Sequence, residues 1–347
     1  MIRAGLITGT QTLELREFPD PVPVEGGVVV DIAYCGICGT DVHAFQSGQP
    51  YNPAICGHEW TGTLSAIGPG VRSLSEGQRV VVATAPACGA CVACRAGQAE
   101  RCQTAFLSAI GRDAASPPHG GFAPRLAVAA TKVVPTDPGL TDLQAAQVEP
   151  FTVAFHAVRS SRLRLGDTAV VQGAGPIGLA TLQWVRAAGA GRVIVVEPNS
   201  GRAALAASLG ASEVVGPGAA ASDLIAERTR GLGADIVYEC VGRPSAIQAA
   251  VDLTRRGGSV CLIGLADGDA TISPHTWLIK EIVFTTALAY FHEEFVMAMG
   301  MIADGRIVTE PLHTGTVGLD ALGGVLAELA GGATDHVKVL VDPHLRS

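Results

Sequence analysis

The sequence is poor in charge, in aromatic side chains and above all in lysine. Charged residues make up 16% and aromatic residues 5% of the 347 positions, and lysine occurs only at 132, 280 and 338. Acidic residues outnumber lysine plus arginine by 32 to 24, which gives a net charge of −8. Such a chain repels nucleic acids and anionic membranes, and it offers few rings for stacking on bases. We therefore expect neither a nucleic acid nor a membrane as partner.

Long apolar runs are also lacking. The longest stretch without charge, about 168–185, contains glycines, Pro176 and two glutamines, so it does not predict a transmembrane helix. Residues 1–9 lack the apolar core and cleavage site of a signal peptide. Hydrophobic residues still amount to 48%, enough for a large core, and the length fits about two domains. We expect a cytoplasmic protein.

Residues 1–150 are expected to form one domain, which the C-terminal segment 291–347 completes. The first region has short β-type runs such as 28–32 and 79–83 between Gly and Pro clusters, which favours a mostly β domain. The C-terminal segment contains one predicted helix, 293–303, and one predicted strand, 337–341. That is too little to fold alone, so we expect it to complete the first domain.

Residues 151–290 instead alternate between apolar runs and helical patterns. Helices are predicted at 177–188 and 202–209. The predicted strands are 168–172, 192–196, 235–239, 259–264 and 282–287. This alternation is typical of βαβ units and a parallel sheet.

Residues 173–178, Gly-Ala-Gly-Pro-Ile-Gly, have the G-x-G-x-x-G spacing of a dinucleotide-binding turn. The turn directly follows a predicted strand and opens a predicted helix, so it would place a pyrophosphate at a helix N-terminus. A simple glycine-rich turn is the alternative. The residues that we assign to the cofactor here are Gly173, Gly175, Pro176, Ile177 and Gly178.

Glu197 ends the next predicted strand, 19 residues after Gly178. A carboxylate there accepts hydrogen bonds from the adenosine ribose of NAD and repels the 2′-phosphate of NADP. A solvated acid at a strand end is the simpler interpretation, and nearby Arg202 could instead receive a 2′-phosphate. Together with the glycine turn, Glu197 predicts a dinucleotide site that takes NAD in preference to NADP.

Nine cysteines are present, an odd number that does not fit a fully disulfide-bonded secreted scaffold. Four of them lie within fifteen residues in the spacing C-x2-C-x2-C-x7-C: Cys88, Cys91, Cys94 and Cys102. Four thiolates at this spacing can close around one tetrahedral zinc ion and leave no open position, so we predict a structural zinc. An iron–sulfur cluster or two disulfides are the alternatives.

A second group of potential metal ligands lies earlier in the chain. Cys38 precedes His58 and Glu59 by about twenty residues, and Glu149 follows where the first domain meets the second. A thiolate, an imidazole and carboxylates suit zinc with an open catalytic position. Singly, each has a simpler interpretation: His58 as a hydrogen-bonded core histidine, Cys38 as a small buried residue, Glu149 as a surface acid.

These motifs, in this order, resemble the zinc-dependent medium-chain alcohol and polyol dehydrogenases. The resemblance is carried by residues 36–41, 57–59, the four-cysteine run, Glu149-Pro150, the glycine turn and residues 338–343, over nearly the whole chain. It implies an α/β fold with a GroES-like, mostly β catalytic domain, residues 1–150 completed by 291–347. It further implies a Rossmann domain with a doubly wound parallel sheet, residues 151–290, and a substrate cleft between the two.

By position, the resemblance makes Cys38, His58 and Glu149 ligands of a catalytic zinc ion. Glu59 would bind that ion directly or through water. Asp41 would orient His58 and fix its tautomer, or would only cap a helix. A glutamate at 149, where simple alcohol members carry cysteine, resembles the polyol, threonine and butanediol branch. We expect two zinc ions per chain, one catalytic and one structural.

Further roles follow from position within the family. Thr40 occupies the proton-relay position and His43 resembles its outlet to solvent, although a helix N-cap and an exposed histidine are the simpler interpretations. Val241 and Ile263, at the ends of successive predicted strands, resemble contacts to the nicotinamide half of the cofactor, and Arg202 lies near the adenosine ribose. Lys338 resembles a pyrophosphate partner, though a charge on an exposed strand explains it equally well.

The leading hypothesis is an NAD-dependent dehydrogenase of a secondary alcohol or polyol, such as a sugar alcohol, cyclitol, diol or amino alcohol. Zinc would act as a Lewis acid while a hydride passes to the nicotinamide. Alternatives are a reductase of simple aldehydes or ketones, and a zinc- and nucleotide-binding module without turnover. A nucleic-acid-binding zinc protein is opposed by the net charge. The family suggests a homo-tetramer or homo-dimer.

Overall fold

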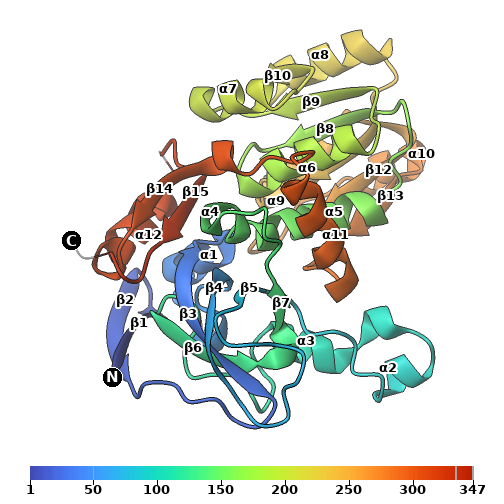
Figure 1. The fold of residues 1–347 in the computed structure, drawn as a ribbon. Helices are drawn as coiled ribbons and strands as arrows, with labels where there is room; N and C mark the ends of the chain where they lie inside the picture. Colours follow the sequence, from blue (N-terminus) through green and yellow to red (C-terminus); the bar gives the residue numbers. More distant parts are fainter. Residues whose placement is uncertain (50, 333, 346–347) are drawn as a thin grey trace. The chain divides into compact units, whose positions relative to one another are not determined.

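The structure is a computed structural model that describes residues 1–49, 51–332 and 334–345. The chain forms two compact units, which are described separately below (Figure 1). Unit 1 comprises Met1–Glu149 and Phe291–Ser347, and unit 2 comprises Pro150–Tyr290. The C-terminal segment therefore belongs to the same unit as the N-terminal one.

Unit 1 is built on an extended, mostly antiparallel sheet with the order β14-β15-β3-β4-β5-β7, in which β6 also pairs with β3. A separate hairpin, β1–β2, completes its strands. The bounds are β1 (Ile2–Gly9), β2 (Thr12–Phe18), β3 (Gly27–Gly36), β4 (Glu59–Ile67), β5 (Arg79–Val82), β6 (Arg125–Ala129), β7 (Val133–Pro135), β14 (His313–Val317) and β15 (Lys338–Val341).

The helices of unit 1 are short and lie in its connections. They are α1 (Gly39–Ser47), α2 (Val92–Arg95), α3 (Gln103–Ala109), α4 (Asp142–Ala145), α11 (His292–Ala303) and α12 (Leu322–Gly331). Short 3-10 turns occur at Pro53–Ile55, Ala99–Arg101, Ala130–Lys132, Glu310–Leu312 and Leu319–Ala321. Apolar residues of β3, β4 and α12 pack into one core cluster, which includes Ile32, Leu64 and Leu322.

The C-terminal strand β15 occupies an interior position in the sheet of unit 1. All four of its residues are buried. It pairs antiparallel with β3 on one side, where Leu340 faces Gly36, and parallel with β14 on the other. Because an interior strand is bonded along both edges, the segment after residue 290 is an integral part of this sheet.

Unit 2 is a parallel sheet with the order β10-β9-β8-β11-β12-β13. Its strands are β8 (Thr168–Gln172), β9 (Arg192–Val196), β10 (Glu213–Val215), β11 (Ala234–Glu239), β12 (Thr254–Leu262) and β13 (Val283–Thr286). Its helices are α6 (Pro176–Ala187), α7 (Ser200–Ser208), α8 (Ala219–Thr229), α9 (Pro244–Leu253) and α10 (Pro274–Lys280), and α5 (Val148–Ser160) leads into the unit. In Figure 1 these elements run from green to orange.

The strand order of unit 2 reverses between β8 and β11. The chain moves outward from β8 through β9 to β10, and then starts again on the other side of β8 with β11. Helix α6 packs on β8 and β9, whereas α9 packs on β11 and β12. The predicted doubly wound α/β fold is thus confirmed, and such sheets bind ligands at the carboxyl ends of the strands where the order reverses.

The elements agree with the sequence-based prediction where the apolar runs are continuous. Strands β8 and β9 have the predicted bounds, whereas β12 begins five residues earlier than expected, at Thr254. Helices α8 and α12 and strands β10 and β14 were not predicted. Among the described residues, no helix is long and apolar enough to cross a membrane.

Candidate active site and metal sites

The glycine turn predicted to bind the dinucleotide joins β8 to α6. Gly178 packs against the end of β8 so closely that a Cβ on it would lie 1.8 Å from the carbonyl oxygen of Gly173. Gly173 itself has a φ of +87°, which favours glycine. At Gly175, by contrast, an added Cβ would meet no atom within 4 Å. Gly175 precedes α6, and Pro176 and Ile177 are the first two residues of that helix. The free space beside Gly175 therefore lies at a helix N-terminus, where an anion such as a pyrophosphate can bind.

Glu197, just after β9, is bonded directly to this turn. Its Oε2 accepts a hydrogen bond from the backbone N–H of Ala174 at 2.7 Å. Its Oε1 accepts from the N–H of Asn199 at 2.8 Å and from Arg202 Nη2 at 2.9 Å. The side chain is buried, so it is not the solvated acid of the simpler interpretation. Arg202 forms an ion pair with Glu197. Its guanidinium group is therefore paired with the same acid that we expect to bind the 2′-OH of NAD.

Val241 and Ile263 follow β11 and β12, the two strands that come after β8 in the sheet order. Val241 is 42% exposed, which is unusual for a valine beside a sheet. A Cβ on Gly173 would lie 3.1 Å from Val241 Cγ2. The structure therefore brings these residues and the glycine turn together at the carboxyl edge of neighbouring strands.

In unit 1 the side chains of Cys38, His58 and Glu59 form one cluster. One potential ligand atom from each lies within 4.8 Å of the others. Cys38 caps the N-terminus of α1, His58 ends the loop before β4, and Glu59 is the first residue of β4. Residues from two elements are thus brought together by the pairing of Gly36 at the end of β3 with Glu59. A thiol, an imidazole and a carboxylate at this spacing fit a zinc ion.

The imidazole of His58 is oriented by a backbone carbonyl. Its Nδ1 lies 3.0 Å from the carbonyl oxygen of Ile55. Because that oxygen can only accept, Nδ1 carries the hydrogen and Nε2 is left as the metal-binding nitrogen. The prediction that Asp41 orients this ring is therefore wrong, since Ile55 occupies that place.

Asp41 is instead bonded to the backbone around the cluster. Its Oδ2 accepts from the N–H of Cys38 at 2.9 Å, as in a helix cap, which confirms the alternative interpretation. Its Oδ1 accepts from the N–H of Gly57 at 3.1 Å and from the hydroxyl of Tyr51 at 2.6 Å. Burial raises the pKa of Asp41, while His58 and these hydrogen bonds oppose that shift. The carboxylate thus joins the Cys38 and His58 segments.

Lys338 forms a buried ion pair with Glu59. Its Nζ lies 2.6 Å from Glu59 Oε2 and donates to the carbonyl oxygen of Ile37 at 3.0 Å. The side chains of Lys338 and Glu59 are 3% and 1% exposed. The prediction of a pyrophosphate contact for Lys338 is therefore corrected, as is the alternative of a charge on an exposed strand. A contact between residues so distant in sequence leaves no local pattern that could have revealed it.

Negative charge is concentrated around His58. Burial by itself lowers the pKa of His58, but the charges of Cys38, Asp41 and Glu149 more than reverse this and raise it well above its usual value. The same balance holds for Lys338: burial lowers its pKa, and Glu59, Cys38 and Glu149 raise it. Glu149, the second residue of α5, therefore lies close enough to act on both His58 and Lys338. Such a field suits a divalent cation.

Thr40 and His43 lie on α1 beside Cys38. Thr40 Oγ1 is 3.5 Å from Cys38 Sγ. The N-cap of α1 is Cys38, so the simpler interpretation of Thr40 as the N-cap is wrong. His43 is partly buried one turn further along the same helix. Residues three apart face the same side of a helix, so Thr40 and His43 form a row that starts at the metal cluster.

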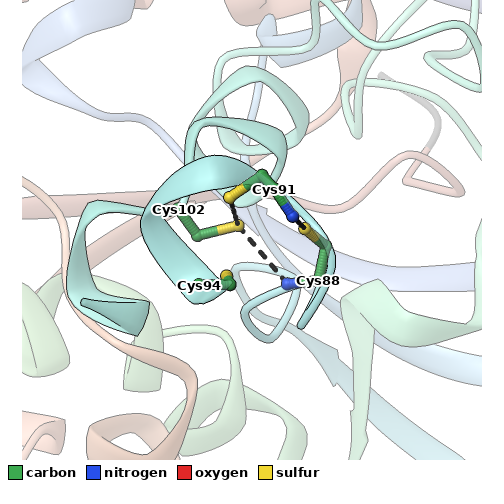
Figure 2. A group of neighbouring side chains, drawn as sticks. All are labelled: Cys88, Cys91, Cys94 and Cys102. Atoms are coloured by element: carbon green, nitrogen blue, oxygen red, sulfur yellow. Dashed lines mark hydrogen bonds between the residues drawn. The ribbon is translucent and has the colours of Figure 1, made fainter. Parts of the chain in front are cut away.

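The four clustered cysteines converge on one point, as Figure 2 shows, with all sulfur atoms within 4.8 Å of one another. Backbone N–H groups donate to these sulfurs, from Cys91 to Cys88 Sγ at 3.3 Å and from Ala105 to Cys102 Sγ at 3.4 Å. Hydrogen bonds from Thr104 and from nearby N–H groups lower the pKa of Cys88 to about 6, which favours the thiolate form that binds zinc. The alternative of two disulfides is wrong, because all nine cysteines are free. Four such sulfurs fit tetrahedral zinc.

Comparison with known proteins links both units to one family. Residues 24–138 match the alcohol dehydrogenase GroES-like domain, and residues 176–304 match the zinc-binding dehydrogenase family. A 2-dehydro-3-deoxy-L-galactonate 5-dehydrogenase from Pseudoalteromonas atlantica is 32% identical and matches over 98% of both chains. The chain belongs to the zinc-type alcohol dehydrogenases. The predicted family is confirmed.

Two further dehydrogenases agree with this assignment. The L-galactonate-5-dehydrogenase of Escherichia coli is 31% identical over 85% of this chain and 85% of that protein. A solved structure of an Escherichia coli alcohol dehydrogenase in complex with NADH is 25% identical and has a TM-score of 0.84. It covers 98% of this chain and 99% of that one. This chain is accordingly an oxidoreductase of the zinc-type alcohol dehydrogenase family.

Proposed function

We propose that this enzyme oxidises a secondary hydroxyl group of a polyol or a sugar acid with NAD, and that the same site reduces the corresponding ketone. The observation that carries the proposal is the cluster of Cys38, His58 and Glu59, with Glu149 close enough to act on it. The two relatives described above are named for galactonate-type sugar acids.

In this proposal Cys38, His58 and Glu149 hold the catalytic zinc ion. The ion supplies Lewis acidity to the substrate oxygen, and NAD accepts the hydride. Ile55 holds the imidazole of His58 in the metal-binding tautomer. Lys338 pairs with the carboxylate of Glu59, which would be a further ligand of the ion, directly or through water. Cys88, Cys91, Cys94 and Cys102 bind the second, structural zinc.

The alcohol proton leaves along α1. The Thr40 hydroxyl, 3.5 Å from the Cys38 sulfur, would accept the proton of the substrate hydroxyl group and pass its own proton onward. His43 lies three residues further along the same helix, where its imidazole can accept the proton and release it to solvent. Reduction of a ketone uses the same groups in reverse.

A substrate screen tests the proposal directly. The purified enzyme is given NAD with sugar acids, sugar alcohols, cyclitols, diols, amino alcohols and simple alcohols, and NADH formation is followed by absorbance. We expect turnover with polyols or sugar acids. Turnover with simple alcohols alone would favour the alternative, a reductase of simple aldehydes and ketones. If the zinc-loaded enzyme turns over no alcohol and no carbonyl compound, the proposal is refuted. That result would favour the other alternative, a zinc- and nucleotide-binding module without catalytic activity.

Zinc content provides the matched control for that screen. The wild-type chain should carry two zinc ions, and Cys38→Ser should lose one zinc and all turnover while keeping its secondary structure. Cys261→Ser is the control variant, because Cys261 is a buried cysteine of β12 in unit 2. It should keep both metals. Retention of both zinc ions by Cys38→Ser would remove Cys38 from the ligand set.

Preference for NAD is assigned to Glu197. Its contacts with Ala174 and Arg202 hold the acid beside the glycine turn. In Glu197→Ala, Arg202 loses its ion-pair partner and can meet a 2′-phosphate. We expect weaker binding of NAD and improved use of NADP, measured as kcat/KM with each cofactor. An unchanged ratio of these constants would refute the assignment.

We also assign the enzyme to the cytosol as a homo-dimer or homo-tetramer. Strand β13 ends the sheet order of unit 2, and edge strands readily pair with a second copy. Reduced thiol clusters of this kind are stable in the cytosol. The molar mass in solution, measured by light scattering, should be two or four times that of the chain. A monomer at micromolar concentration would contradict this assignment.

A further inference from the structure

Glu239 is a buried acid whose function the sequence did not suggest. It ends β11, which lies directly beside β8 at the point where the strand order of unit 2 reverses. Its side chain is fully buried. The glycine turn and Glu197 lie on the β8 and β9 side of this point, where the adenosine half of NAD is assigned. Glu239 therefore lies on the side left for the nicotinamide half.

Hydrogen bonds from two loops end on Glu239. Its carboxylate accepts from the N–H groups of Val241 at 2.7 Å and Gly242 at 3.1 Å. Its carbonyl oxygen accepts from the N–H groups of Ile263 and Gly264, both at 2.9 Å. One residue thus fixes both loops that carry the residues assigned to the nicotinamide, Val241 and Ile263.

The two loops are in close contact around this carboxylate. A Cβ on Gly264 would lie 2.7 Å from Glu239 Oε2 and 2.3 Å from the nitrogen of Gly242. Gly242 has a φ of +70°, and a Cβ there would lie 2.6 Å from the carbonyl oxygen of Leu265. Glycine is required at both positions because the loops approach so closely. The position of Val241 relative to Gly173 therefore depends on Glu239.

Glu239 has no basic partner within the described residues. Its side-chain oxygens meet only backbone N–H donors, which are the partners of an ionised carboxylate. Burial raises the pKa of Glu239, and those N–H groups oppose the shift. A neutral glutamine could accept the same hydrogen bonds through its own oxygen, so the charge is not needed to hold the loops. An uncompensated buried charge costs stability. We therefore expect the charge of Glu239 to have a function when the cofactor is bound.

We infer that Glu239 is a positioning residue for the nicotinamide, and that its carboxylate favours the oxidised, positively charged ring over the neutral reduced one. The inference rests on the proposed assignment of Val241 and Ile263 to the nicotinamide half. An anion on that side of the sheet attracts the positive charge of the oxidised nicotinamide ring, which the reduced ring of NADH lacks. The acid would thereby shift the equilibrium on the enzyme toward bound NAD.

Binding measurements on the zinc-loaded enzyme test this inference. Dissociation constants are measured by calorimetry for NAD, NADH and ADP-ribose, which has the adenosine and pyrophosphate but no nicotinamide. In Glu239→Gln we expect the ratio of the NAD constant to the NADH constant to rise about tenfold, with ADP-ribose unchanged. An equal change for NAD and NADH, or no change, would overturn the inference.

Two further variants make the result specific. Glu197→Gln, on the adenosine side, should weaken all three ligands by a similar factor and leave the NAD to NADH ratio unchanged. If Glu239→Gln does not fold, Glu239→Asp replaces it: the charge is kept but the loop contacts lengthen, so both constants should rise while their ratio stays within about twofold. A changed ratio there would contradict the electrostatic role. Failure of the wild type to bind any of the three ligands would refute the proposed function instead.

Discussion

At the level of single residues, the buried ion pair of Lys338 and Glu59 is the feature that is hardest to predict from the sequence. The two positions are 279 residues apart, and their side chains meet in the interior of unit 1. Lysine and glutamate are rarely buried unless they are paired. Each therefore depends on the other, and removing one leaves an uncompensated charge.

Lys338→Met should destabilise unit 1 by about 3–5 kcal/mol, because it leaves the Glu59 carboxylate buried without its partner. Chemical denaturation followed by fluorescence measures the loss. The double variant Lys338→Met with Glu59→Gln should recover most of it, since no buried charge is left alone. As a control, Lys280→Met removes a lysine bonded only to backbone carbonyl oxygens and should cost less. A loss below about 1 kcal/mol for Lys338→Met would contradict the structural role of the pair.

The residue identities of the metal cluster and of the dinucleotide turn could be predicted, because each rests on a local motif. The partners of those residues could not. The carbonyl of Ile55 that orients His58 has no side-chain signature. Asp41 was assigned to His58, whereas the fold directs it to the backbone of Cys38 and Gly57. A motif fixes which residues are present, and tertiary contacts decide what each one touches.

Among the elements, the turn between β8 and α6 shows two glycines with different roles. Gly178→Ala should destabilise unit 2, because the new Cβ would collide with the carbonyl oxygen of Gly173. Gly175→Ala should leave the fold intact, since a Cβ there meets no protein atom within 4 Å, but should block the approach of the pyrophosphate. Thermal unfolding and NADH titration separate the two effects. The assignment fails if Gly175→Ala binds NADH as tightly as the wild type.

The four-cysteine segment has little structure of its own. Its helix α2 spans only Val92–Arg95, and Cys88 and most residues around it are exposed. A zinc ion bound to the four cysteines would therefore supply the stability of the segment. Cys94→Ser should leave one zinc per chain and open the segment to trypsin at Arg95 and Arg101, as mass spectrometry of the fragments would show. If cleavage there stays as slow as in the wild type, the metal has no structural role.

Whether a helix or strand can be predicted from the sequence depends on the amino-acid composition of its segment. Strands β8 and β9 are continuous apolar runs in a fully covered parallel sheet, so their bounds were predicted correctly. Helix α12 contains Gly323 and Gly324 near its start, which weakens the helical pattern. Strand β14, with the sequence His-Thr-Gly-Thr-Val, has no apolar alternation. Both become ordered only through tertiary contacts in unit 1.

For the whole molecule, the two units differ in how the chain builds them. Unit 2 is continuous, whereas the sheet of unit 1 takes two strands from beyond residue 290. A chain of residues 1–290 should therefore keep a folded unit 2 that binds ADP-ribose, but should lose the ordered unit 1 and its catalytic zinc. Calorimetric unfolding and zinc analysis test this. Two zinc ions bound to the truncated chain would show that β15 is dispensable.

The interior position of β15 also sets the order in which the enzyme can be assembled during synthesis. A ribosome delivers the chain from its N-terminus, so unit 2 is complete once Tyr290 has emerged. At that moment Cys38, His58 and all four clustered cysteines have been exposed to solvent for some time, while Lys338 has yet to be made. Metal can therefore reach the thiols of a nascent chain before the sheet around them closes. The last strand to arrive both seals the catalytic centre and brings the cation that neutralises Glu59.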